Sequence, residues 1–185
     1  MNPLLTAMRQ TLDDPRGVAR WIIAQKFAPS VAAMALGLVS ILTSILSAVV
    51  MLIAPDEMFN FSPLQLALGQ VGGLFVAAGL IVWIGQMFGG KGRFSDAVAL
   101  VAWAEAIMFA LQLMQFIALF VLPAATVVLA LVGLALLIWL MVQFIAELHG
   151  FANLWAVFFG MIGTLLAVSF ILAAVMAAVL GPAYV

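Results

Sequence analysis

Five long apolar stretches constrain this chain more than any other feature of its sequence. They cover residues 31–54, 64–88, 97–122, 124–146 and 154–180, and Glu105 is the only charged residue inside them. About 20 apolar residues suffice for a helix to cross the hydrocarbon core of a membrane. Lipid offers no hydrogen-bond partner to the backbone, and the strands of a membrane barrel would alternate in polarity. We therefore predict an all-α polytopic membrane protein, a bundle of five transmembrane helices.

The third and fourth stretches are separated only by a short segment around Pro123. A continuous helix over residues 97–146 would be about 75 Å long at 1.5 Å per residue. The hydrocarbon core is only about 30 Å thick. The sequence therefore predicts a tight helical hairpin at Pro123.

The overall composition excludes several classes of protein. Of the 185 residues, 68% are hydrophobic and 7% are charged, whereas soluble domains carry about 25% charged residues. A soluble enzyme, a nucleic-acid-binding protein and a disordered protein are therefore excluded. The chain has no cysteine, a single histidine and no phosphate-binding loop motif. We expect no enzymatic activity, no catalytic residues, no cofactor, no metal site and no nucleic-acid partner.

The basic residues lie on one side of the predicted topology. All six precede the first stretch or lie between the second and third, whereas the loop after the first stretch carries only Asp56 and Glu57. The positive-inside rule then places the N-terminus and residues 89–96 in the cytoplasm, and residues 181–185 outside. The first stretch is too long for the apolar region of a cleavable signal peptide.

Residues 1–30 are expected to form an amphipathic cytoplasmic segment. Asp14 and Pro15 are typical of a helix N-cap followed by proline at the first helical position. The segment is either an interfacial helix that binds an anionic leaflet or an ordinary lead-in to the first span. The candidate contacts with lipid head groups are Arg16, Arg20, Lys26, Lys91 and Arg93.

Glu105 is the one residue whose place in the membrane is costly. An acid near the bilayer centre costs about 2.5–3.5 kcal/mol on insertion scales. Two glutamines follow on nearby faces of the same predicted helix, and the first span carries a stripe of hydroxyl groups. Together they form a candidate intramembrane polar cluster of Glu105, Gln112, Gln115, Ser40, Thr43, Ser44 and Ser47. The cluster is either a proton- or cation-linked site or a set of contacts that hold the helices together.

Two further features of the sequence, its small residues and the polar residues at the ends of the spans, have structural interpretations. Small residues such as Gly69 and Gly73 would let helices approach closely, either within one chain or between copies in an oligomer. We interpret Glu147 and His149 as part of a polar loop after the fourth span, and we expect Ser95 or Asp96 to cap the third span.

Several segments resemble the Yip family, membrane proteins named for interacting with Ypt/Rab GTPases. The lead-in Asp-Pro-Arg-Gly-Val-Ala-Arg at residues 14–20 is similar to that of bacterial members. The glycine-rich loop at residues 89–94, the helix opening at 97–104, and residues 138–139 and 148–150 also resemble the family. The resemblance implies five spans, a cytoplasmic N-terminus and no settled enzymatic activity. Eukaryotic members carry a long cytosolic N-terminal region, so this chain resembles a bacterial inner-membrane member, and a Rab-type GTPase partner is not expected.

Two functions from different classes follow. The first is a non-enzymatic membrane protein that organises lipids or partner membrane proteins, as a homo-oligomer or with other chains. The second is a small proton- or ion-linked transporter, or a permeation subunit, that uses Glu105. A permeation pathway needs polar residues at several depths on several helices, and the second, fourth and fifth spans supply few. This distribution favours the first function.

Overall fold

The computed structural model describes residues 3–53 and 62–180, with the side chains of residues 6–53 and 62–178. The predictions for the loop acids Asp56 and Glu57 and for the tail at residues 181–185 fall outside the described residues. All regular structure in the described part is helical, and five helices are long and apolar enough to cross a membrane. The predicted all-α polytopic fold is thereby confirmed. The helices are α1 (Pro3–Asp13), α2 (Pro15–Ala24), α3 (Pro29–Ile53), α4 (Pro63–Met87), α5 (Phe94–Val121), α6 (Pro123–His149) and α7 (Leu154–Leu180).

The short helix α2 begins as its sequence predicts. The Asp14 side chain accepts a hydrogen bond from the backbone N–H of Gly17 at 2.8 Å, and Pro15 occupies the first helical position. This cap satisfies a backbone donor that would otherwise lack a partner. Val18 and Ile22 are buried, and they anchor α2 against the membrane helices.

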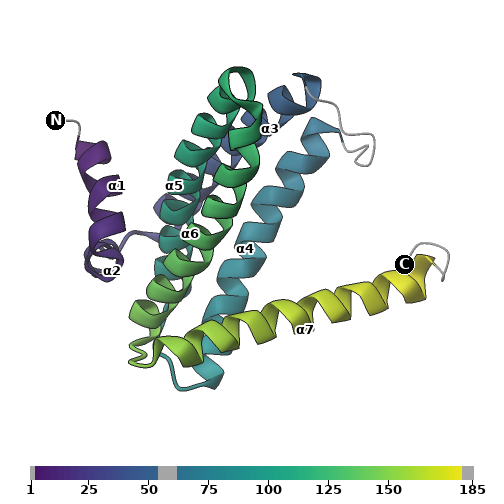
Figure 1. Ribbon diagram of the computed structural model, residues 1–185. Helices are drawn as coiled ribbons and strands as arrows, with labels where there is room; N and C mark the ends of the chain where they lie inside the picture. The colour runs from purple at the N-terminus through teal and green to yellow at the C-terminus, as the bar shows by residue number, and fades with distance from the viewer. Residues whose placement is uncertain (1–2, 54–61, 181–185) are drawn as a thin grey trace.

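Helix α5 occupies the centre of the bundle, where it packs most extensively against α3 and α6 (Figure 1). The chain reverses at Leu122 between α5 and α6, as the hairpin prediction requires. Gly133 of α6 permits a close approach to α5, because a Cβ there would lie 2.8 Å from Cδ2 of Leu111. The largest buried group of side chains includes residues 97–102 of α5.

The connections alternate between the two ends of the bundle. Figure 1 shows the α4–α5 and α6–α7 connections at one end, and the α5–α6 turn at the opposite end. We call the first of these the loop end, defined by residues 88–93 and 150–153. Alternation of this kind is what successive crossings of a membrane require.

Helix α7 leaves the bundle after its first turns (Figure 1). Val157 is buried against Val142 and Ala146 of α6, with Leu154 and other early residues packed around it. In the most apolar 18-residue stretch of α7, none of the residues is buried by the described part of the chain. Most of this helix therefore presents apolar side chains outward.

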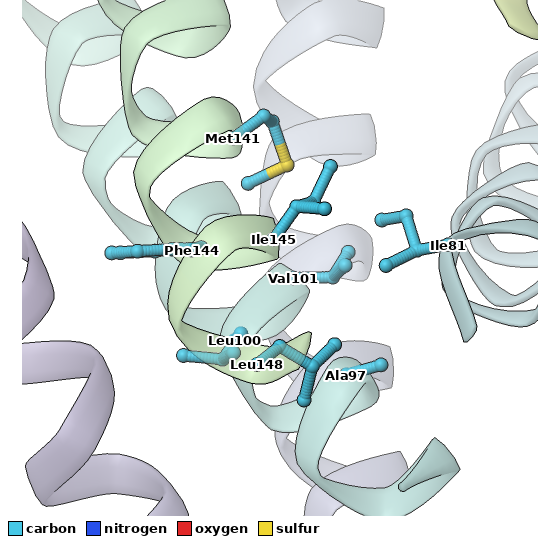
Figure 2. Close-up of a pocket in the computed structure, with 8 residues that line it drawn as sticks. All are labelled: Ile81, Ala97, Leu100, Val101, Met141, Phe144, Ile145 and Leu148. Carbon is cyan, nitrogen blue, oxygen red and sulfur yellow. The ribbon is translucent and has the colours of Figure 1, made fainter. Parts of the chain in front are cut away.

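The core at the loop end contains one small void between α4, α5 and α6. Its volume is about 10 Å³, and the side chains that line it are all apolar (Figure 2). Ile81 faces Val101 and Ile145 across it in the close-up. A space of this size and polarity is a packing defect with no groups to orient a ligand.

Candidate functional site

Glu105 is held by a hydrogen-bonded chain that joins three membrane helices. Gln70 of α4 donates from Nε2 to Oε1 of Glu105 at 2.6 Å. Its amide oxygen therefore faces α3, where the Ser44 hydroxyl lies 3.1 Å away. The same hydroxyl lies 2.8 Å from the carbonyl oxygen of Ser40, so its single proton is shared between two acceptors. Glu105 is thus linked to the hydroxyl-bearing residues of α3 through the Gln70 side chain.

A second contact between α3 and α5 lies two turns along from Glu105. Gln112 donates from Nε2 to the Ser47 hydroxyl at 2.9 Å. Oε1 of Gln112 and Oγ1 of Thr43 are buried without a hydrogen-bond partner among the described residues. Ser40 is fully buried, but its hydroxyl bonds to the Leu36 carbonyl of its own helix at 2.7 Å.

The candidate cluster is therefore divided between two faces of α5. Glu105 and Gln112 face α3 and α4, together with Ser44 and Ser47. Gln115 turns toward α6, where its Nε2 would lie 3.8 Å from a Cβ at Gly133. This division follows from the helical period, which places residue 115 about 80° away from residue 105.

Gln70 is the member of this chain that the sequence interpretation missed. It is the only amide, hydroxyl-bearing or charged side chain between residues 66 and 85 of α4. A lone amide in an apolar span shows no helical pattern with other polar residues. Its signal was the cost of an amide in lipid, which requires a partner on a neighbouring helix.

His149 forms a second polar centre, at the loop end of the bundle. The interpretation of Glu147 and His149 as a loop is wrong, because both lie in the last turn of α6. Gly150 adopts a left-handed conformation with φ of 74° and ends the helix one residue later. Only 4% of the His149 surface is exposed.

Both ring nitrogens of His149 bond to backbone groups of other elements. The Gly92 N–H donates to Nδ1 at 3.2 Å. Because Nδ1 accepts that bond, the ring proton lies on Nε2, which donates to the Ile81 carbonyl at 3.1 Å. One side chain thereby joins α4, the α4–α5 loop and α6.

Three glycines make room for the imidazole ring. A Cβ at Gly85 or at Gly90 would lie 2.2 Å from a ring nitrogen, and one at Gly92 would lie 2.7 Å from Cε1. Glycine at these positions is thus required by the close approach of the ring. The expected side-chain cap at Ser95 or Asp96 is also wrong: α5 begins at Phe94 without one, and the His149 contact holds the preceding loop.

The two arginines of α2 contact the end of α6 and the connection that follows it. Nη2 of Arg16 donates to the Phe151 carbonyl at 3.2 Å. Nη1 of Arg20 lies 3.3 Å from Oε2 of Glu147. Arg16 and Arg20 were expected as candidate contacts with lipid head groups, and these contacts within the protein, which fix α2 to the loop end, were not expected. The other candidate head-group contacts, Lys26, Lys91 and Arg93, are exposed.

The geometry of both centres is that of structural contacts between helices. Among the described residues no three histidine, aspartate or glutamate side chains are grouped so as to hold a metal ion. Glu105 lines neither the void of Figure 2 nor the larger groove near the N-terminus. The chain of hydrogen bonds can hold α3, α4 and α5 in register.

The architecture defines a multi-pass helical integral membrane protein. The model of the Yip1 domain matches residues 9–176, which includes α2 through most of α7. The chain therefore belongs to the Yip1-domain family. No curated protein and no solved structure matches it.

Proposed function

We propose that this protein is a non-enzymatic member of its family that organises membrane lipids or partner membrane proteins. The observation that carries the proposal is α7, a 27-residue apolar helix whose buried packing against the described residues lies in its first turns. The exposed side chains of its outer half include Phe170, Ile171 and Leu172. Apolar surface of this length must be covered by lipid or by another protein.

A photo-reactive amino acid at Phe170 tests this proposal in native membranes. We expect cross-links to lipid or to a second polypeptide. The matched control is Leu140 of α6, which is fully buried inside the bundle and should cross-link only within its own chain. Cross-links from residue 170 solely to α3, α4, α5 or α6 of the same chain would contradict the proposal.

A transporter that uses Glu105 is the second candidate function. Two buried oxygen atoms, on Thr43 and Gln112, lack partners among the described residues and favour it, because such atoms are available to a permeating water or cation. We rank it second because the described partners of Glu105 already join three helices through Gln70 and Ser44. A transporter predicts a flux that Glu105→Gln abolishes.

We place the protein in a bacterial inner membrane, with residues 1–30 cytoplasmic, residues 31–180 forming the membrane domain and residues 181–185 periplasmic. The grouping of all six basic residues supports this orientation. The resemblance of residues 14–20 to the lead-in of bacterial family members supports the assignment to a bacterial inner membrane. Cysteines introduced at Lys91 and Glu57 should react with an impermeant reagent from opposite sides. Reaction from one side would refute the topology.

A further inference from the structure

The two hydrogen bonds of His149 require one protonation state of its ring. The backbone N–H of Gly92 donates to Nδ1 at 3.2 Å, and Nε2 donates to the carbonyl oxygen of Ile81 at 3.1 Å. A neutral imidazole has one donor and one acceptor, whereas an imidazolium has two donors and no acceptor. A proton on Nδ1 would therefore point at the Gly92 N–H and abolish that hydrogen bond.

The surroundings of the ring leave it no room to turn within the closed structure. The ring of Phe151 stacks on the imidazole, with centroids 5.4 Å apart and an interplanar angle of 21°. A Cβ at Gly85 or at Gly90 would lie 2.2 Å from a ring nitrogen, so the backbone is already close on these sides. A charged ring is therefore accommodated only when the segment that carries Gly92 moves away and water reaches Nδ1.

The carboxylates on the neighbouring elements do not pair with the ring. Glu147 of the same helix is engaged by Arg20 of α2 at 3.3 Å, and Asp14 caps the start of α2. Asp96 lies in the first turn of α5, and it forms no ion pair with His149 among the described residues. Helices α4 and α7 and residues 150–153 carry no charged side chain. Nothing in the closed arrangement thus compensates a positive charge on the ring.

The cations near the ring would oppose a positive charge on it. Lys91 and Arg93 are exposed and flank Gly92, the residue that bonds to the ring. Nη2 of Arg16 donates to the carbonyl oxygen of Phe151, whose ring stacks on the imidazole. Because like charges repel, a proton on the ring favours departure of the loop that carries Lys91 and Arg93.

The other hydrogen bonds of this loop lead back to α4. Gln86 donates from Nε2 to the Gly92 carbonyl oxygen at 3.0 Å, and the Gly90 N–H donates to the Gly85 carbonyl oxygen at 2.8 Å. Within the described part of the chain, the bond from Gly92 to His149 is the one hydrogen bond that joins the loop to α6. Loss of this bond can therefore release the loop from α6 while the loop stays attached to α4.

We propose that His149 is an acid-sensitive latch between α6 and residues 88–93. The neutral ring holds the loop closed, and a proton on Nδ1 opens it. Because the closed state excludes this proton and the open state accepts it, a falling pH shifts the balance toward the open state. Free histidine gains a proton near about pH 6.5, so the loop should open below that value. This response to acid goes beyond the proposed function and does not depend on what the protein organises in the membrane.

A spin label on a cysteine at residue 91 reports the state of the loop, because Lys91 is exposed and the chain has no other cysteine. The mobility of the label is measured on the full chain in lipid vesicles from about pH 8 to about pH 5. We expect the ratio of mobile to immobile label to rise by up to about tenfold per pH unit, as one linked proton requires. A label at the exposed Ala124, at the start of α6, is the control for general unfolding and should not respond. No change at residue 91, or an equal change at residue 124, would overturn the proposal.

Substitutions identify the group that titrates. His149→Gln keeps one donor and one acceptor but has no ionisable ring, so it should remove the response of the label to pH. Glu147→Gln and Asp96→Asn are the matched controls, since each neutralises a carboxylate near the loop end, and both should retain the response. A response that persists in His149→Gln, or that disappears in either control, would assign the titration to another group and contradict the latch.

A measurement on the ring itself needs no substitution at residue 149. The chain has one histidine, so nitrogen NMR of protein with isotope-labelled histidine observes this ring alone. We expect a neutral ring with its proton on Nε2 at high pH and a doubly protonated ring at low pH, with the same midpoint as the mobility of the label. A ring that stays neutral while the loop opens, or that gains its proton while the loop stays closed, would refute the latch and leave the proposed function standing.

Discussion

The enclosure of His149 by glycines makes a sharp prediction about Gly85→Ala. In a helix interior, alanine is favoured over glycine by about 1 kcal/mol. At Gly85, however, the new methyl group would lie 2.2 Å from Nε2 of His149. The ring cannot rotate away without losing its bonds to Gly92 and Ile81.

The magnitude follows from the two hydrogen bonds that the ring would lose. Each contributes about 1 kcal/mol, and buried backbone groups left without partners add to the cost. The loss of about 2–3 kcal/mol outweighs the gain in helix propensity, so Gly85→Ala should destabilise the protein by about 1–2 kcal/mol. Gly73→Ala is the control in the same helix, because a Cβ there meets nothing within 4 Å, and it should be neutral or stabilising.

A double-mutant cycle identifies the ring as the cause. His149→Ala alone should destabilise the protein, but Gly85→Ala made in that background should stabilise it by up to about 1 kcal/mol. The free energy of unfolding is measured by titration with a denaturing detergent, with helicity as the signal. If Gly85→Ala destabilises equally with and without His149, the close contact is not the cause and the reasoning is refuted.

Further predictions concern the other contacts between helices. Gln70→Leu and Glu105→Leu should each lower the free energy of unfolding by about 1 kcal/mol. The double variant should lose less than the sum, since both changes break the same hydrogen bond between Gln70 and Glu105. Arg20→Ala should cost less than about 1 kcal/mol, with a difference from wild type that shrinks at high salt, because its side chain is 59% exposed. Thr11→Val removes the acceptor for Trp103, and a change in tryptophan fluorescence should report the freed indole. An unchanged spectrum would mean that this hydrogen bond does not form in solution.

The fold was predictable because hydropathy is a local property of the sequence. Five long apolar stretches and the proline at residue 123 specify the helices, the hairpin and the membrane class without any knowledge of tertiary contacts. The cap at Asp14 was predictable for the same reason, since both partners of its hydrogen bond lie within four residues.

The contacts of His149 and Gln70 were not predictable because they join residues far apart in the chain. His149 meets Gly92 across 57 residues, and no spacing pattern links a histidine to glycines in other helices. Gln70 is the lone amide between residues 66 and 85, so only its cost in lipid marked it. The choice of Glu105 as its partner depends on how α4 packs against α5. The acid itself was predictable, because one charge in five apolar spans is unmistakable.

We infer that the intramembrane polar chain holds the helices together and conducts no proton, and this inference ranks the proposed function above the transporter. The most direct measurement is proton flux into vesicles that contain wild type or Glu105→Gln, read with an internal pH-sensitive dye. Glutamine keeps the hydrogen-bonding shape of the side chain and removes the ionisable group. We predict that both proteins give the flux of empty vesicles. Flux through wild type that Glu105→Gln abolishes would contradict the claim.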